Sequence, residues 1–488
     1  MMANLMQALD STIANVALPY MQGSLNATAD QITWVLTSYV IAAAVMTAPV
    51  GWMAARFGRR NLHLACLAGF IATSMLCGAA QSLEQIVVFR LLQGVCGAAL
   101  VPLAQSTMLD IYPFEQRAHA MSLFGMGVMI GPILGPTLGG WLTDAYDWRW
   151  VFYVNLPFGL VALTGLAIFL PRAPARPEMK FDWTGFGVLA LGIGAFQLML
   201  DRGQQADWFT SREIVVEAVL AGLGIYLFIV HLFTAERPFI PRDVFNDRNF
   251  SSALVMMFFV GMVLLASSAL LAPYLQNLAN YPVYDAGLVM APRGAGTMLA
   301  MLVAGRIGTR IDQRMLVALG LLTLSATLYA MSGWTPDVPP HELMLVIFVQ
   351  GVSMGLIFNP MQVLAFSTLA PALRGSATSM LSLCRNLGAA IGVSVTSFML
   401  VQNEQVSHAD LAAVATPFNR LLAAPGIGQW LDPGHARGAE LLDAMINRQA
   451  MIIAYADDYR MMTLVALTPM ALLFLMRRHR RVLPAAGD

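Results

Sequence analysis

The chain has 488 residues, of which 58% are hydrophobic and 11% charged, and its 28 lysines and arginines balance its 28 aspartates and glutamates. Soluble domains carry roughly 25% charged residues, so this composition excludes an ordinary soluble protein and predicts one that crosses a membrane many times. A formal net charge of zero gives no reason to expect nucleic acid or another strongly charged partner.

Apolar stretches of spanning length recur along the whole chain, each near the ~20 residues that a transmembrane helix needs. No cleavable signal peptide is visible, so the first stretch is interpreted as a retained but short span. The stretches are 2–21, 32–54, 62–80, 86–108, 118–142, 150–170, 183–201, 213–233, 251–276, 286–305, 315–333, 342–368, 376–401 and 460–476. They predict an all-α polytopic membrane protein with fourteen transmembrane helices.

The basic residues divide unequally between alternate connections, which orients a membrane protein because cytoplasmic loops are rich in lysine and arginine. One set of connections contains eighteen: Arg56, Arg59, Arg60, Arg117, Arg172, Arg176, Lys180, Arg237, Arg242, Arg248, Arg306, Arg310, Arg314, Arg374, Arg477, Arg478, Arg480 and Arg481. The other contains seven: Arg149, Arg202, Arg212, Arg420, Arg437, Arg448 and Arg460. This distribution predicts that both termini are cytoplasmic.

One connection, about 402–459 on the outer side, is much longer than the rest. Its segment ARGAELLDAMINRQAMIIAYADDY (436–459) spaces apolar residues as an amphipathic helix does. Such a helix is expected to lie on the membrane surface or on a partner. A helix that caps the bundle and a docking element are both compatible with the pattern.

No pattern typical of an enzyme or a metal site is found. GVSMG (351–355) matches the GxSxG nucleophile pattern, but it lies inside an apolar helix, whereas the nucleophile requires a strand–turn–helix elbow. P-loop, HExxH and glycine-rich dinucleotide motifs are absent from the sequence. The cysteines lie in apolar segments without paired spacing and are interpreted as packing residues: Cys66, Cys77, Cys96 and Cys384. We therefore expect neither enzymatic activity nor a cofactor or metal.

Asp10 lies within the first apolar stretch, where a carboxylate costs roughly 2.5–3.5 kcal/mol on insertion scales. On a helix it shares a polar or small stripe with Gln7, Ala14 and Ala17. The stripe is expected to face the protein interior or a wet cavity, where the acid could take up and release a proton. The alternative is a carboxylate held in a permanent ion pair.

Arg90 begins RLLQGVCGAALVP (90–102) and shares a helix face with Gln93 and Gly97. Arginine keeps its charge under almost any condition, so Arg90 is a candidate counter-ion for a titrating acid or an anionic ligand. It could instead only neutralise Asp10.

Arg293 and Arg385 also fall inside apolar stretches. Together with Gln93 and with Gln7 of the Asp10 stripe, they are the candidate lining of a substrate cavity, near the counter-ion Arg90. Three positive charges against one carboxylate favour anionic or weakly acidic amphiphiles. Each arginine could instead extend to the membrane interface, Arg293 most readily because it lies near a helix end.

The stretch GVMIGPILGPTLGGWL (127–142) places glycine at every fourth residue, so one helix face is bare backbone. Two prolines each remove a backbone hydrogen bond. We predict a hinge or seal that comprises Gly127, Gly131, Pro132, Gly135, Pro136, Gly139 and Gly140.

GWMAARFGRR (51–60) joins the second and third predicted helices, and GRIGTRIDQR (305–314) lies at a similar turn in the second half. Repeats of this kind build many transporters. The candidate residues of the first loop are Gly51, Arg56, Gly58, Arg59 and Arg60.

These motifs, in this order, resemble the signatures of the major facilitator superfamily and of its fourteen-helix drug/proton antiporter branch. LDSTIANVALP (9–19) is the first of these signatures, and LDRGQQADWF (200–209) and VFNDRNF (244–250) add the likeness to EmrB-type multidrug export subunits. The resemblance implies two six-helix bundles, 1–170 and 251–488, with an inserted helix pair in 171–250. The periplasmic loop 402–459 then belongs to the second bundle.

The resemblance also implies alternating access and export of drugs or toxic compounds in exchange for protons, without a further cofactor. It implies a Gram-negative inner membrane location, a periplasmic adaptor and an outer-membrane channel. In this family, the residues matching Asp10 and Arg90 are associated with proton coupling, and the glycine–proline run with the direction of antiport.

Two alternatives remain at this point. One is a substrate-specific exporter of a siderophore, fatty acid or secondary metabolite. The other, more remote, is a membrane sensor or scaffold that does not transport.

The chain also has Ala55 where the loop motif usually carries an acid, which predicts a weakened charge contact between helices.

Overall fold

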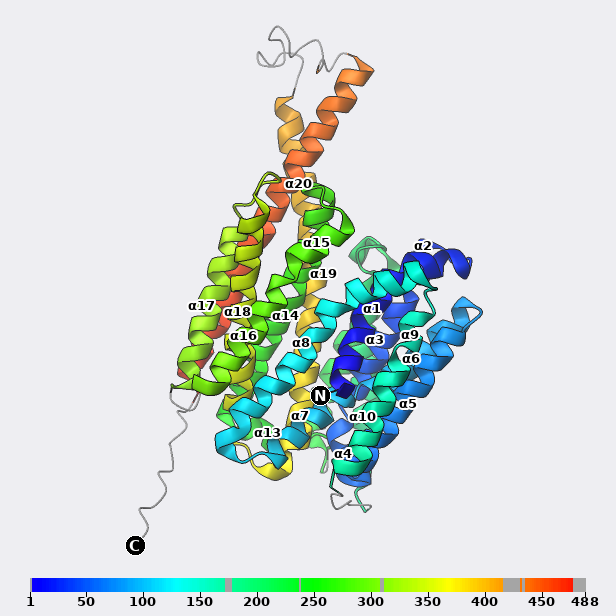
Figure 1. Ribbon diagram of the computed structural model, residues 1–488, viewed down its shortest axis with the longest axis vertical. Coiled ribbons are helices and arrows are strands. Elements are labelled where there is room, and N and C mark those ends of the chain that lie inside the picture. Colours follow the sequence, from blue (N-terminus) through cyan, green and yellow to red (C-terminus); the bar gives the residue numbers. More distant parts are fainter. Residues whose placement is uncertain are drawn as a thin grey trace.

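The computed structural model describes residues 2–171, 178–236, 238–307, 311–415, 431 and 435–476. Every regular element in these residues is a helix, and the all-α prediction is confirmed. The helices form two bundles that lie side by side (Figure 1). The first contains α1 (Met2–Ser24), α2 (Ala29–Ile32), α3 (Trp34–Thr47), α4 (Val50–Phe57), α5 (Arg59–Ala79), α6 (Leu83–Gly97), α7 (Leu100–Ile111), α8 (Phe114–Ala145), α9 (Trp150–Tyr153) and α10 (Asn155–Phe169).

The second bundle follows a short connecting region. Between the bundles in sequence lie α11 (Trp183–Arg202), η1 (Trp208–Thr210), α12 (Arg212–Thr234) and α13 (Asp243–Asn246). The second bundle contains α14 (Arg248–Pro273), η2 (Tyr274–Leu278), α15 (Val283–Met290), α16 (Pro292–Ile307), α17 (Gln313–Met331), α18 (Pro340–Ala365), η3 (Pro371–Leu373), α19 (Arg374–Val414), α20 (Ala436–Leu467) and η4 (Thr468–Phe474).

Each predicted apolar stretch falls on one helix or on consecutive helices. Ten helices of the described residues are long and apolar enough to cross a membrane, or eleven if the pair α3 and α4 counts as one broken span. That pair is bent by 60° at a break that contains Pro49, which cannot donate a backbone hydrogen bond. The count of fourteen spans remains a prediction.

The helix pair α11 and α12 packs on itself and contacts both bundles, through α3 and α19. Its two helices approach at Gly192 and Gly224, where a Cβ on Gly224 would lie 2.6 Å from the Gly192 Cα. Only glycine permits this backbone contact. The inserted pair is thus a compact unit that touches both bundles.

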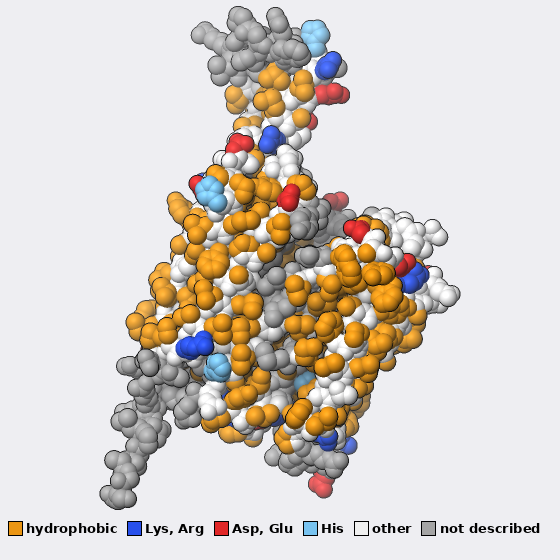
Figure 2. Space-filling model, viewed as in Figure 1, with side chains coloured by type: hydrophobic (Ala, Val, Ile, Leu, Met, Phe, Trp, Pro, Cys, Tyr) orange, Lys and Arg blue, Asp and Glu red, His pale blue; other side chains and the backbone are white. Residues whose placement is uncertain are grey.

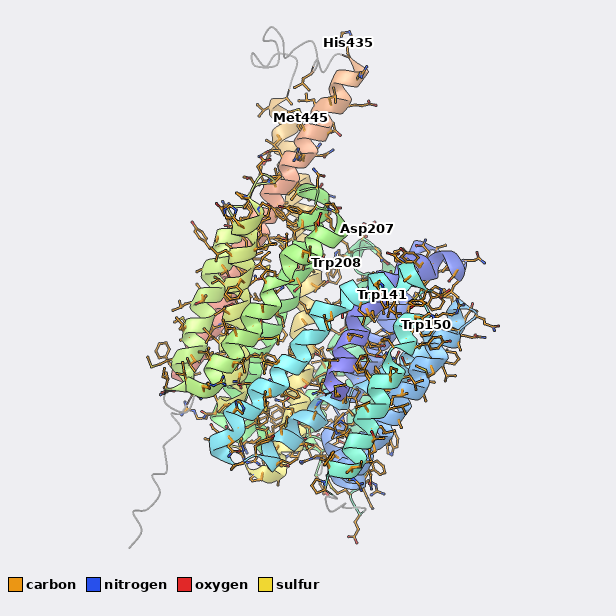
Figure 3. All side chains as sticks on the ribbon, in the orientation of Figure 1. Trp141, Trp150, Asp207, Trp208, His435 and Met445 are labelled. Atoms are coloured by element: carbon orange, nitrogen blue, oxygen red, sulfur yellow. The ribbon has the colours of Figure 1, made fainter. Side chains whose placement is uncertain are left out.

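Apolar side chains cover the flanks of both bundles, as expected for surfaces that face lipid (Figure 2). Trp141 and Trp150 lie close together at one end of the first bundle (Figure 3) and are 56% and 48% exposed. Aromatic side chains of this kind are typical of the membrane–water interface.

The segment predicted as a long outer loop is largely helical. α19 continues to Val414, and α20 runs without a break from Ala436 into the bundle. Residues 402–414 and 436–450 form a two-helix extension beyond the bundles, here called the projecting hairpin (Figure 1). The prediction of a helix lying on the membrane surface is wrong, because the amphipathic segment is the first part of the last helix. Met445 is 58% exposed on this extension (Figure 3).

The two ends of the molecule carry different features. The hairpin end carries the projecting hairpin, and the loop-motif end carries the turn between α4 and α5. Gly58 stands at this turn with φ 83°, a left-handed value that favours glycine.

Candidate functional site: a buried ion pair between helices

Helix α1 holds Asp10 inside the first bundle, where the residue is 0% exposed. Ala14 and Ala17 of the same stripe are also fully buried. Gln7 is half-buried, and its Nε2 donates a hydrogen bond to the Tyr39 hydroxyl at 3.3 Å. The polar stripe of α1 therefore faces protein.

Arg90, on α6, faces Asp10. Its Nη1 donates to Asp10 Oδ2 at 2.8 Å, and both side chains are at most 1% exposed. Its Nε donates to the Val35 carbonyl oxygen at 3.1 Å, and Nη1 also donates to Gln93 Oε1 at 2.9 Å. The guanidinium carbon lies 4.3 Å from the centre of the Tyr39 ring. Arg90 is therefore fixed from α1, α3 and its own helix.

The second oxygen of Asp10 is equally well occupied. Oδ1 accepts hydrogen bonds from Gln93 Nε2 at 3.0 Å and from Asn155 Nδ2 at 2.8 Å. Asn155 Nδ2 also donates to Ser74 Oγ at 3.0 Å. A carboxylate with three donors, one of them a cation, is suited to the ionised state. In this conformation the site is a closed ion pair.

Asn155 is a site residue that the sequence analysis missed. It opens α10 directly after the short helix α9, inside the predicted apolar stretch 150–170 and with no motif around it. A polar amide within that apolar stretch was the available signal.

The glycine face of α8 packs on the helix that carries Asp10. A Cβ on Gly131 would lie 2.6 Å from the Ala8 Cβ, and one on Gly139 would lie 2.8 Å from the Ile13 Cγ1. A Cβ on Gly135 would collide with the Thr12 hydroxyl.

The other members of the predicted hinge differ. Gly127 is buried, and a Cβ on Gly140 would meet open space. Pro132 and Pro136 fall within α8, but their side chains lie outside the described residues. The close contact between α8 and α1 thus comes from three glycines of one face.

The structure places Arg293 and Arg385 in the second bundle, away from the helices that hold Asp10. Arg293 stands in the first turn of α16, and its guanidinium donates to Ser268 Oγ at 2.5 Å and Ser267 Oγ at 2.9 Å on α14. It is therefore held between helices. The Arg385 guanidinium carbon lies 5.9 Å from the centre of the Phe358 ring. Of the four residues proposed to line a cavity, Gln7 and Gln93 belong to the surroundings of the ion pair.

At the loop-motif end, charged groups join the two bundles. Asp110 of α7 contacts Arg59 and also accepts a hydrogen bond from Arg374 Nη1 at 2.9 Å, at the start of α19. Gly51 lies against the backbone of Ser376, with 2.5 Å between a Cβ on Gly51 and the Ser376 Cα. A charge contact between the bundles thus exists although Ala55 replaces the usual acid.

The remaining arginines of the loop motif bind backbone oxygens. Arg56 Nη1 donates to the Met179 carbonyl at 2.6 Å, and Arg60 Nη2 donates to the Ala167 carbonyl at 2.6 Å. In the second-half repeat, residues 308–310 lie outside the described residues.

A small cavity of about 140 Å³ lies between α3 and the inserted pair, apart from the Asp10 site. It is lined by Gln31, Thr33, Trp34, Thr37, Asp201, Arg202 and Gln205. Part of the LDRGQQADWF segment therefore serves as the contact between α11 and the first bundle.

Residues 1–393 match the model of the Major Facilitator Superfamily. The chain belongs to this superfamily. It is 36% identical over 420 residues to the multidrug export protein EmrB of Haemophilus influenzae, covering 86% of this chain and 82% of that protein. It is 35% identical over 456 residues to the fatty acid resistance protein FarB of Neisseria gonorrhoeae, covering 93% and 90%.

The fold is shared with more distant transporters. The human organic anion transporter MFSD10 superposes with a TM-score of 0.59 at 15% identity, covering 97% of this chain and 98% of that one. The predicted major facilitator fold and EmrB-type membership are confirmed. The protein is a multi-pass membrane transporter and not an enzyme.

Proposed function

We propose that the protein exports hydrophobic, weakly acidic drugs or toxic compounds in exchange for protons, by alternating access across the bacterial inner membrane. The EmrB relative supports multidrug efflux by its name. The observation that carries proton exchange is the fully buried Asp10–Arg90 pair. An ionisable group at membrane depth has a functional role by default.

In this proposal the loop-motif end and both termini are cytoplasmic, which the unequal distribution of lysine and arginine supports. The bundles touch at that end, through Asp110 with Arg374 and Gly51 with Ser376. The described conformation is then closed toward the cytoplasm, and Asp10 is paired in it.

In the proposed cycle, a proton from the outer side neutralises Asp10 and removes its attraction for Arg90. Arg90 then offers its charge to an anionic substrate once the cytoplasmic side has opened. Asp10 releases the proton inward while the bundles rock about α8. A ligand can drive such a change only if it binds the two states differently, and the ion pair supplies that difference.

A preference for acids is supported by the charges of the second bundle. Among the described residues, no carboxylate lies within ion-pair distance of Arg293 or Arg385. Cationic side chains in a low-dielectric surrounding attract anions and repel cations.

Export by Asp10→Asn in inverted vesicles tests the proton site. Drug-dependent proton flux should be abolished, because asparagine cannot take up or release the proton, while the protein stays folded. Asp144→Asn is the matched control, since Asp144 is an exposed acid that accepts a hydrogen bond from the Tyr20 hydroxyl at 2.6 Å. Export against a gradient by Asp10→Asn would show that the assignment is wrong.

A substrate-specific exporter is the second candidate, and the FarB relative favours fatty acids as its substrates. Resistance profiles separate the two functions, because a broad exporter protects cells against unrelated compounds. Collapse of the pH gradient with acidic and cationic dyes of matched hydrophobicity tests the charge preference. A stronger effect on cationic dyes would contradict it.

We also propose that the protein works with a periplasmic adaptor and an outer-membrane channel, as the resemblance to EmrB-type subunits implies. Cross-linking in whole cells tests this partnership. The expected product joins this chain to a periplasmic protein anchored by a single helix.

A further inference from the structure

A second carboxyl, Asp458, is as deeply buried as Asp10. It lies on α20 where the projecting hairpin enters the second bundle, and it is 0% exposed. The sequence analysis placed it in an outer loop, where an acid needs no explanation. Its burial between helices does need one.

The hydrogen bonds of Asp458 differ from those of Asp10. Its Oδ1 accepts one long hydrogen bond, from Asn403 Nδ2 on α19 at 3.3 Å, and its Oδ2 is buried without a partner. Asp10 accepts from an arginine and two amides. No cation lies within 4.0 Å of Asp458 among the described residues.

The charged and titratable groups around Asp458 do not supply the missing positive charge. On α20 they are Tyr455, Asp457, Tyr459 and Arg460, and on α19 Glu404 interacts electrostatically with Tyr455. Arg460 is exposed and binds Asp457 at 3.0 Å.

In the part of the chain that the structure describes, helices on the other sides add no cation within ion-pair distance of Asp458. The element η2, which continues α14, contains Tyr274, and this side chain interacts electrostatically with Tyr281 and Asp337. Arg293 of α16 interacts electrostatically with Tyr459 and not measurably with Asp458. The Tyr459 hydroxyl is itself buried without a hydrogen bond.

An ionised carboxylate in this position would be a buried charge with one weak donor and no counter-ion. Such a charge costs far more than a neutral carboxylic acid, so a group in this surrounding binds a proton instead. We propose that Asp458 is a second proton-binding site, in the second bundle, which carries its proton in the conformation described here. The two buried acids are therefore in opposite states: Asp10 ionised and paired, Asp458 neutral.

Release of this proton requires water at the base of the projecting hairpin, between α19 and α20. Its use in transport, as a proton carried by the second bundle beside the one at Asp10, rests on the proposed function. The bound proton itself does not.

Infrared difference spectroscopy of the full-length protein in lipid nanodiscs at neutral pH tests the site directly. The wild type should show a protonated-carboxyl band that Asp458→Asn removes. Asp457→Asn, which changes the exposed neighbour, should leave the band in place. A folded Asp458→Asn protein with an unchanged carboxyl region would overturn the proposal.

Thermal stability against pH gives a second measurement. The unfolded chain releases the Asp458 proton above about pH 4, whereas the folded protein retains it, so rising pH should destabilise the wild type relative to Asp458→Asn. The gap in melting temperature should widen from acidic to neutral pH. A wild type that instead gains stability over Asp458→Asn as pH rises would contradict a retained proton.

The transport role has a separate readout. In proteoliposomes, Asp458→Asn should reduce the protons moved per substrate, while Asp10→Asn abolishes proton flux. If Asp10→Asn still couples, the proposed function fails and the infrared result stands. If Asp10→Asn abolishes proton flux but Asp458→Asn moves as many protons per substrate as the wild type, the transport role of Asp458 is wrong.

Discussion

At the residue scale, the chemistry of this protein depends on how completely a buried charge is satisfied. Asp10 accepts bonds from Arg90, Gln93 and Asn155. Removing one partner of a buried pair leaves the other group with its full desolvation cost. The same rule applied to Asp458, which has one donor, predicts the neutral form.

Asn155→Ala tests the contribution of the overlooked donor. It removes the 2.8 Å hydrogen bond to Asp10 Oδ1 and should destabilise the protein by about 1–3 kcal/mol, the usual cost of an unsatisfied buried group. Export should fall as the ionised form of Asp10 loses support. Asn61→Ala is the control, because Asn61 is exposed and donates a hydrogen bond to the Phe57 carbonyl of its own turn. Equal melting temperatures for the two variants would count against this role.

At the element scale, α8 and α1 behave as one packed unit, because three glycines of α8 lie directly on α1. The close approach leaves no space for a side chain at those positions. Motion of α8 is therefore passed to the helix that carries Asp10. In the projecting hairpin, the last part of α19 packs against the first part of α20.

Gly131→Ala should disrupt this packing. Its Cβ would lie 2.6–2.7 Å from the Ala8 Cβ, the Ala8 carbonyl carbon and the Leu9 nitrogen, and backbone atoms cannot move aside easily. Overpacking of this kind costs roughly 1–3 kcal/mol, and export should fall with it. Gly140→Ala is the matched control on the same helix, because a Cβ there meets nothing within 4 Å. Melting temperature and dye export measure the difference, and a harmless Gly131→Ala would exclude the tight contact.

At the scale of the whole molecule, the two bundles are held together at the loop-motif end by a partly exposed ion contact and by backbone packing. A partly exposed ion pair contributes about 1 kcal/mol or less to the stability of the contact. This is enough to bias a two-state equilibrium without locking it, as alternating access requires.

Arg374→Gln should shift the protein toward the form open at the loop-motif end, by up to about fivefold for a loss of about 1 kcal/mol. A cysteine placed at Gln105, which is 2% exposed in the closed form, should then react faster with a membrane-impermeant thiol reagent in inverted vesicles. Arg314→Gln is the control, because Arg314 binds Asp312 within the second bundle. Equal labelling rates in both backgrounds would rule out a role of Arg374 in closure.

The sequence by itself determined the local features. Apolar length fixed where the helices lie, and helical periodicity identified the Asp10 stripe and the glycine face of α8, because both depend on neighbours along one helix. The tertiary structure alone decided which distant residues meet: Asn155 with Asp10, Arg374 with Asp110, and Asn403 with Asp458. Hydropathy also began the last helix too late, because the polar first half of α20 is stabilised by packing on α19, and tertiary packing rather than apolar length holds such a helix.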